Sequence, residues 1–137
     1  MFKRLVVMAL SIALIGTIGV FNNKPIFNDY ASCYEVYVGT QSSNAKIISV
    51  TKNTYSLIHN KVGESCKING VFYLREFLSS MNAELVFKED TEEGTSYYAY
   101  SNRIRYKRTV CGKVVNLHVF IGKSGVTVGS PIIYGSF

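Results

Sequence analysis

The sequence predicts an α+β domain in which an antiparallel sheet of about four to five strands packs on one or two helices. The 137 residues suit one domain, and 47% hydrophobic with 18% charged residues is the composition of a globular protein. A helix-spaced apolar stripe lies in the middle of the chain, and strand-like segments separated by short turns follow it. This length argues against a two-domain enzyme with a separate cofactor module.

The N-terminus predicts export. Lys3 and Arg4 precede the uncharged apolar run 5–21, which is the order of the two regions of a signal peptide. A polar stretch ends this run just short of the roughly 20 residues that span a bilayer. No Ala-x-Ala site follows, so we expect residues 1–21 to be a signal peptide or an N-terminal anchor. The protein is therefore expected to be extracytoplasmic and to meet the membrane only through this segment.

Two further regions follow the leader. Residues 22–33 are predicted as a polar linker, and residues 34–137 as the single α+β domain. The linker ends in Tyr-Ala-Ser-Cys, which resembles a lipoprotein processing box with Cys33 as the lipidated residue. Tyr30 in place of an aliphatic residue, and the distance from the apolar run, favour a chain without lipid.

The first half of the domain predicts a strand and then a helix. Residues 34–38 alternate in polarity as a short strand does, and Gly39 ends them. Between residues 46 and 62, apolar side chains fall near helical spacing, and Gly63 is a reasonable stop. The β-branched run 47–51 also allows this segment to begin as a strand.

The clearest helix is predicted over residues 71–81. Its apolar side chains occupy one face, at Val71, Leu74, Phe77, Leu78 and Met81. We expect this face to pack on the sheet.

The second half predicts an antiparallel meander. Its strand-like segments are 84–88, 95–107, 113–121 and 126–134. Short turns join them, as antiparallel neighbours require. One face of the third segment, with Val115, Leu117, Val119 and Ile121, is expected to meet the helix.

Cysteine and histidine positions predict no catalytic or metal site. One disulfide and one free thiol among Cys33, Cys66 and Cys111 is the simplest arrangement outside the cytoplasm, with the pairing open; three buried thiols are the alternative. No Cys/His cluster suggests a metal, and no cofactor is expected. Cys111 and His118 would lie about 23 Å apart along one strand. We therefore expect no enzymatic activity.

Arg103, Arg105 and Lys107 are the candidate ligand-binding residues. They alternate along the predicted strand 95–107 and so project from one face, with several tyrosines nearby. The net charge is +6, or +4 once Lys3 and Arg4 leave with the signal. Such a face suits an anionic polymer, either nucleic acid or a cell-wall polymer. The alternative is an ordinary solvated outer face of the sheet.

Four stretches of the last 60 or so residues carry a family resemblance. They read Phe-Leu-Ser-Ser-Met-Asn-Ala at 77–83, Ala-Tyr-Ser at 99–101, Val-Asn-Leu at 115–117 and Val-Gly-Ser-Pro-Ile-Ile at 128–133. In order and spacing they resemble the YwmB-like family of exported proteins from spore-forming Gram-positive bacteria. Members of that family are longer and contain two related halves, so this chain resembles a shortened or remote member.

The resemblance implies a fold like one half of the TATA-box-binding protein, and a cell-envelope or sporulation-linked role without a known reaction. We therefore expect a non-catalytic exported domain that acts through contacts with an unknown envelope protein. A likeness of shape does not confer DNA binding, so no nucleic-acid partner is expected. The alternative function is the cationic module for anionic polymers. A second resemblance, of residues 73–78 and 83–87 to the copper amine oxidase N-terminal-like stalk domain, explains less of the chain.

Overall fold

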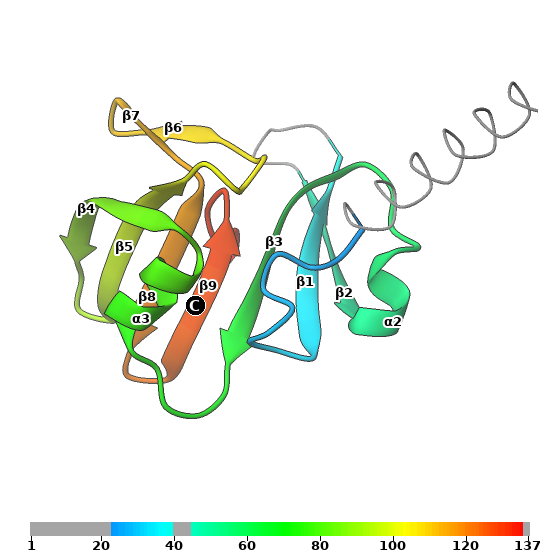
Figure 1. The fold of residues 1–137 in the computed structure, drawn as a ribbon, viewed down its shortest axis with the longest axis horizontal. Helices are drawn as coiled ribbons and strands as arrows, with labels where there is room; N and C mark the ends of the chain where they lie inside the picture. Colours follow the sequence, from blue (N-terminus) through cyan, green and yellow to red (C-terminus); the bar gives the residue numbers. More distant parts are fainter. Residues whose placement is uncertain (1–22, 40–44, 136–137) are drawn as a thin grey trace, which may run out of the picture.

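The computed structural model describes residues 23–39 and 45–135. Seven strands form one antiparallel sheet in the order β2-β1-β3-β9-β8-β5-β4 (Figure 1). These strands are β1 (Cys33–Val38), β2 (Lys46–Thr51), β3 (Lys61–Ile68), β4 (Ala83–Asp90), β5 (Gly94–Ser101), β8 (Leu117–Gly122) and β9 (Gly125–Ser130). A two-stranded hairpin, β6 (Arg108–Val110) with β7 (Lys113–Val115), stands apart. The helices are α2 (Lys52–Tyr55) and α3 (Leu74–Ser80). The α+β class is confirmed, but the sheet has seven strands rather than four or five.

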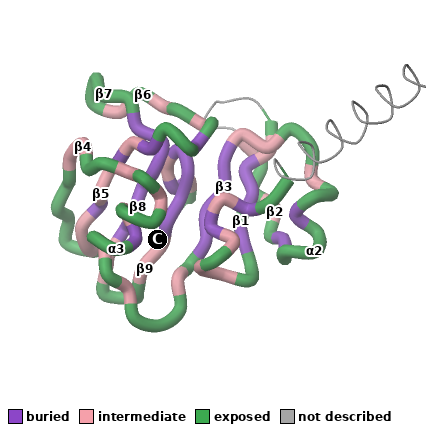
Figure 2. Tube along the Cα trace, in the orientation of Figure 1, coloured by how far each residue is buried: buried purple, intermediate pink, exposed green. Residues whose placement is uncertain are grey.

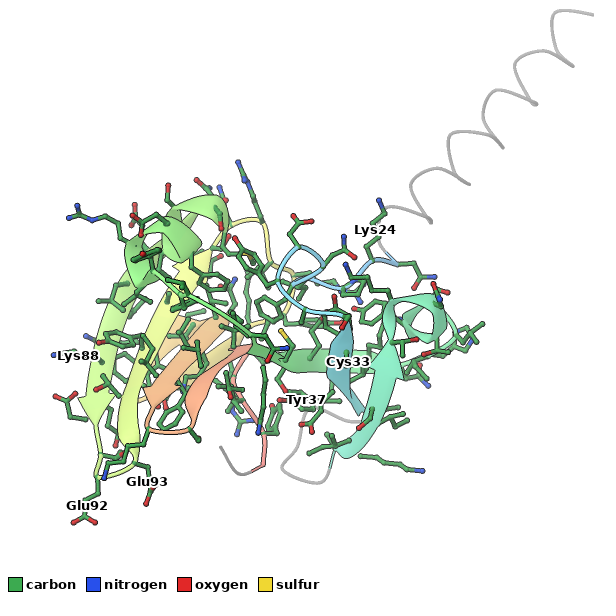
Figure 3. All side chains as sticks on the ribbon, turned by 90° about the horizontal axis from the view of Figure 1, so that it is seen from below. Lys24, Cys33, Tyr37, Lys88, Glu92 and Glu93 are labelled. Atoms are coloured by element: carbon green, nitrogen blue, oxygen red, sulfur yellow. The ribbon has the colours of Figure 1, made fainter. Side chains whose placement is uncertain are left out.

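The core lies on one face of the sheet, which we call the inner face. Val119 of β8 pairs with Val128 of β9, and both side chains are fully buried with Leu117. Phe77 of α3 and Phe27 cover them with stacked rings 6.3 Å apart. Figure 2 shows burial concentrated along the central strands, and Figure 3 shows α3 and the segment before β1 on one side of the sheet, with the C-terminal segment on the other.

The predicted helix 71–81 exists, but it begins later. α3 starts at Leu74, and Val71 is 80% exposed rather than on the core face. Phe77 is buried, and Leu74, Leu78 and Met81 pack partly buried against the core. The prediction that this helix covers the strand carrying Leu117 and Val119 is confirmed.

The predicted helix over 46–62 is wrong, and the alternative that this segment begins as a strand is confirmed. The segment forms strand β2, a single helical turn α2, and the start of β3. The β-branched residues of β2 pair with β1 along its whole length, from Lys46 with Val38 to Thr51 with Cys33. Only Tyr55 of α2 is buried, so the apolar spacing did not describe a helix face.

The meander in the second half is confirmed with changed boundaries. β5 ends at Ser101, so residues 102–107 are a turn and an irregular segment rather than strand. The predicted strand 113–121 breaks at Asn116 into β7 and β8. The last strand ends at Ser130, directly before Pro131, which has no N–H for a ladder.

The predicted linker 22–33 is not a linker over its described part. Residues 23–32 fold onto the sheet, and Phe27 among them is fully buried in the core. Cys33 already belongs to β1. The predicted leader, residues 1–21, lies outside the described residues. In the described part of the chain, no helix has the length and apolar character needed to cross a membrane.

Candidate functional site

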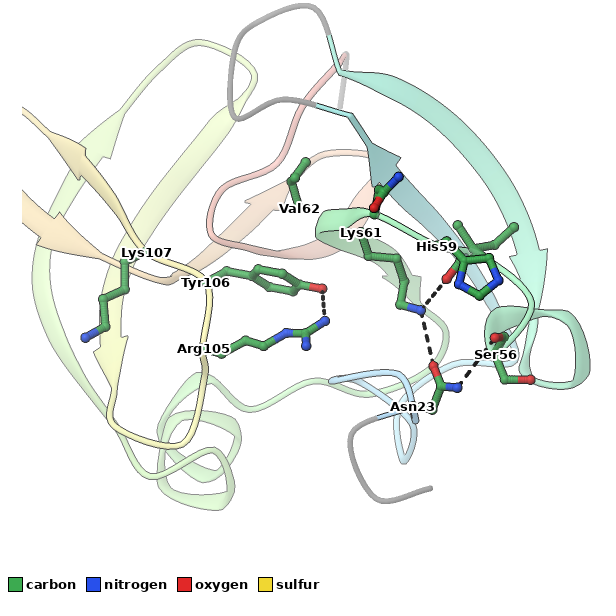
Figure 4. Close-up of a pocket in the computed structure, with 10 residues that line it drawn as sticks. Asn23, Ser56, His59, Lys61, Val62, Arg105, Tyr106 and Lys107 are labelled. Atoms are coloured by element: carbon green, nitrogen blue, oxygen red, sulfur yellow. Dashed lines mark hydrogen bonds between the residues drawn. The ribbon is translucent and has the colours of Figure 1, made fainter. Parts of the chain in front are cut away.

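A cationic groove opens between the loop before β3 and the segment that follows β5. Its volume is about 820 Å³. The two walls face each other in Figure 4, with Arg105 and Lys107 on one side and His59 and Lys61 on the other. The remaining lining residues are Asn23, Ser56, Ile58, Asn60, Val62 and Tyr106. No acidic side chain lines this groove.

A second groove continues from the first past Val62, Tyr106 and Lys107, which line both. Its volume is about 440 Å³. It adds one cation, Arg108, and a more apolar wall made by Val114, Pro131 and the ring of Tyr134; Thr109 completes it. We call the two together the basic groove.

Each of the four charged residues of the basic groove lies against a tyrosine. The Lys61 ammonium is 4.7 Å from the centre of the Tyr55 ring, and the Lys107 ammonium 5.7 Å from that of Tyr100. The Arg105 and Arg108 guanidinium carbons lie 4.9 Å and 5.4 Å from the ring centres of Tyr106 and Tyr134. Both arginines also donate hydrogen bonds to these phenol oxygens, at 2.9 Å and 2.7 Å. The rings orient the cations without neutralising them.

The charge of the groove has no carboxylate counterpart at the surface. Among residues 23–39 and 45–135, the one side-chain ion pair joins Lys88 to Asp90, away from the groove. The acidic turn 89–93 precedes β5 whereas the groove segment follows it, so about 25 Å of strand separates them. Burial, and then the nearby charge of Arg105, lower the pKa of Lys61. A bound anion would offset both effects.

Buried hydrogen bonds fix the segment that carries Arg105 and Lys107. Asn116, fully buried, donates from its side-chain amide to the carbonyls of Ser101 at 2.6 Å and Ile104 at 3.1 Å. Its Oδ1 accepts from the Ser101 amide at 2.7 Å. The chain therefore leaves β5 in a tight turn, with buried Ile104 as its apolar anchor. Lys61 is held on the opposite wall, where its ammonium donates to the Ile58 carbonyl at 2.6 Å and to Asn23 Oδ1 at 3.3 Å.

The predicted site residues are only partly brought together. Arg105 and Lys107 line the groove, but Arg103 is an exposed turn residue that lines neither part. The prediction that these three residues alternate along a strand is wrong, because β5 ends at Ser101, before the first of them. Lys61 and Arg108 complete the set. The sequence pattern did not indicate Lys61 as a groove residue, because it predicted a helix at that position. Arg108 directly follows the predicted residue Lys107 in sequence.

The cysteines do not form the predicted disulfide. All three are free, with Cys33 and Cys111 exposed and Cys66 buried. Cys33 and Cys66 lie on neighbouring strands, but their registers place them on opposite faces of the sheet. Burial, and next the charge of Glu64, raise the pKa of Cys66 to about 12, so this thiol is protonated at neutral pH.

The two histidines lie in different parts of the fold. Burial lowers the pKa of His118 to about 4, so it is neutral. His118 pairs with Gly129 on the outer face, whereas Cys66 points to the inner face. His59 lines the basic groove, which contains no cysteine.

Within the described ranges, no group of three or more His, Cys, Asp or Glu side chains is arranged to hold a metal ion. Comparison of the chain with family models, curated proteins and solved structures found no match.

Proposed function

We propose that this protein is a non-catalytic, extracytoplasmic binding domain whose basic groove holds a linear anionic phosphodiester polymer of the cell envelope. The observation that carries the proposal is the set of four cations, Lys61, Arg105, Lys107 and Arg108, along one continuous groove without a carboxylate. Repeated phosphates along a chain match repeated cations along a groove, and the released counterions favour binding.

Two features of the sequence support the envelope as the setting. The apolar run 5–21 behind Lys3 and Arg4 has the order of an export signal. The C-terminal half resembles the YwmB-like family. Our proposal includes the envelope role of that family and a fold like one half of the TATA-box-binding protein. Outside the cytoplasm, wall or lipid-linked polymers are the abundant phosphodiesters, so we commit to them over nucleic acid.

Contact with an envelope protein ranks second. The exposed large apolar side chains of the described surface are Ile47, Leu57, Val71, Tyr73, Leu85 and Val114. Ile47 and Leu85 lie on β2 and β4, the two opposite edge strands of the sheet, so these side chains do not form one patch. Scattered single side chains are ordinary for a monomer, whereas a standard interface buries about 800 Å² on each partner. The described surface therefore favours a charged ligand.

The test uses the full-length chain purified in mild detergent, with poly(glycerol phosphate) as the probe. One variant replaces Lys61, Arg105, Lys107 and Arg108 by Gln. The control variant replaces four exposed cations outside the groove by Gln and so has the same net charge as the groove variant. These are Lys46, Arg75, Arg103 and Lys123. We expect the groove variant to lose affinity by a factor of 30 or more at about 0.1 M salt, and the control by less than about threefold.

Three results would overturn the proposal. Equal losses in both variants would show attraction by overall charge alone. Full affinity in the groove variant would move the site elsewhere. The groove could also bind a single-stranded oligonucleotide more tightly than poly(glycerol phosphate). That result would identify nucleic acid, and not an envelope polymer, as the ligand of the groove. Circular dichroism of each variant confirms that it is folded before the comparison.

A further inference from the structure

A buried carboxylate lies beneath the basic groove. Glu64 belongs to β3, the strand that begins at the groove residue Lys61, and its side chain is fully buried. Its position opposite Val36 on β1 and Ser130 on β9 places it on the inner face of the sheet. Oε1 accepts a 2.6 Å hydrogen bond from the Tyr55 hydroxyl. Oε2 has no hydrogen-bond partner of good geometry among the described residues.

Tyr55 connects this carboxylate to the groove. Its hydroxyl binds Glu64, while its ring carries the Lys61 ammonium at 4.7 Å. The two contacts place Glu64, Tyr55 and Lys61 in one chain of interactions, running from the core to the groove wall. Glu64 is thereby a support for a groove cation and does not itself line the groove.

The charge of Glu64 is felt on both walls. Burial and Arg105 lower the pKa of Lys61, and the charge of Glu64 opposes that lowering because a nearby negative charge favours the protonated cation. On the other wall, the hydrogen bond to Tyr106 is the main cause of the raised pKa of Arg105, and the charge of Glu64 adds to it. Burial raises the pKa of Tyr106, and the charge of Glu64 adds to that effect too. An ionised Glu64 therefore offsets part of the positive potential that would attract an anion.

We propose that Glu64 is an acid-sensitive positioning residue of the basic groove, whose protonation removes this opposing charge and tightens the binding of the anionic polymer. The inference rests on the proposed function, because it concerns the regulation of the same site. By linkage, the bound polymer must also make Glu64 easier to protonate.

The direction of the response follows from the surroundings of Glu64. Burial raises its pKa to about 6, against the opposing effects of the Tyr55 hydrogen bond, the Ile26 amide, Lys61 and Arg105. The other titratable groups near it are Tyr34, Cys66 and Tyr106, whose pKa values burial raises. Those groups stay neutral at pH 5–7.5. Affinity is therefore expected to rise as the pH falls from 7 to 5.

His59 also lines the groove. The experiment must separate the effect of Glu64 on polymer binding from that of His59. Affinity for poly(glycerol phosphate) is measured from pH 5 to 7.5 at constant salt, on the full-length chain and on Glu64→Gln and His59→Gln. Gln has nearly the volume of Glu and keeps an oxygen to accept the Tyr55 hydrogen bond.

In the wild type, we expect affinity to rise on the order of fivefold between pH 7.5 and 5. Glu64→Gln should bind tightly already at pH 7.5 and lack this rise, whereas His59→Gln should keep it. An unchanged pH response in Glu64→Gln, or its complete loss in His59→Gln, would overturn the inference.

A second measurement uses the wild-type chain and so tests the inference even if the Glu64→Gln variant fails to fold. NMR of the wild-type Glu64 carboxyl carbon, with and without poly(glycerol phosphate), should show a higher pKa in the presence of the polymer. An unchanged pKa with polymer bound contradicts the inference and leaves the proposed function intact. Absence of polymer binding at every pH would instead defeat the proposed function itself.

Discussion

At the scale of single residues, the groove depends on side chains that never reach it. Asn116 makes three hydrogen bonds to the main chain of Ser101 and Ile104, and these bonds set the path of the segment bearing Arg105 and Lys107. A buried main-chain group without a partner costs about 1–3 kcal/mol. The position between β7 and β8 is therefore fixed by polar contacts, although its neighbours Val115 and Leu117 are fully buried apolar residues.

Replacement of Asn116 by Ala should destabilise the fold by about 3 kcal/mol and weaken polymer binding in proportion to the loss of order in residues 102–107. Urea unfolding gives the first quantity and a binding titration the second. Asn102→Ala is the matched control, because Asn102 is exposed and its side chain accepts a hydrogen bond from exposed Asn82 at 2.8 Å. A cost below about 0.5 kcal/mol for Asn116→Ala would contradict this account.

Sequence reasoning reaches some of these residues and misses others for physical reasons. Phe77 was predicted to be buried because helical spacing marks a core-facing side chain. Asn116 and Glu64 break the rule that buried positions in a sheet are apolar. The residues next to them in sequence do not indicate which groups form hydrogen bonds with them. Tyr55 lies nine positions from Glu64, and their hydrogen bond depends on the chain turning back between α2 and β3.

At the scale of elements, α3 is the cover of the inner face. Its contribution rests on Phe77, whose ring also contacts Tyr30 with centres 4.9 Å apart. Because α3 has only seven residues, its own main-chain bonds are too few to hold it, and packing must do so. The later start of the helix leaves Val71 outside this packing.

Phe77→Ala should cost about 3–5 kcal/mol of unfolding free energy, because it removes a buried aromatic ring and leaves a cavity. Val71→Ala should change the unfolding free energy by less than about 0.5 kcal/mol, since Val71 is 80% exposed. Urea unfolding of both variants checks the pair. Equal costs would mean that the helix begins at Val71, as its sequence spacing indicated.

One strand that sequence analysis missed, β3, is buried on both faces over part of its length. β3 reads Lys-Val-Gly-Glu-Ser-Cys-Lys-Ile, and its residues 63–66 are all buried. A strand covered on both sides shows no alternation of polarity, so period-two analysis cannot detect it. Gly63 adds to this difficulty. A Cβ there would lie 2.4 Å from the Ser130 carbonyl oxygen, so glycine marks a close approach of β3 and β9 and not the end of a helix.

At the scale of the whole molecule, two buried groups give opposite responses to acid. The raised pKa of Glu64 means that the folded state takes up a proton more readily than the unfolded chain, so its contribution to stability is lost as the pH rises through about 6. The lowered pKa of His118, caused by burial, contributes stability that is lost as the pH falls from about 6.5 toward 4. Between pH 6.5 and 4.5 the two contributions offset each other.

Glu64→Gln should therefore be more stable than the wild type at pH 7.5, by on the order of 2 kcal/mol, and nearly equal to it at pH 4.5. The variant should also lose stability more steeply on acidification, because the titration of His118 is no longer offset. Thermal unfolding across this pH range measures both effects. A variant less stable than the wild type at pH 7.5 would show that ionised Glu64 stabilises the fold.

The groove as a whole was only half predictable. Arg105 and Lys107 lie close in sequence to Arg108, so local charge marked one wall. The other wall comes from Lys61, more than forty positions earlier, and it faces Arg105 because β3 lies next to β9 in the sheet. Sequence periodicity describes local elements and carries no information about such long-range strand order.

The place of β9 has a consequence for the newborn chain. This strand is the last of the seven to leave the ribosome, yet it lies between β3 and β8 and alone joins the two halves of the sheet. Until residues 125–130 emerge, β1–β3 and β4–β8 have only open edges toward each other. A polypeptide that completes its fold this late stays threadable for longer, which the export that we propose would require.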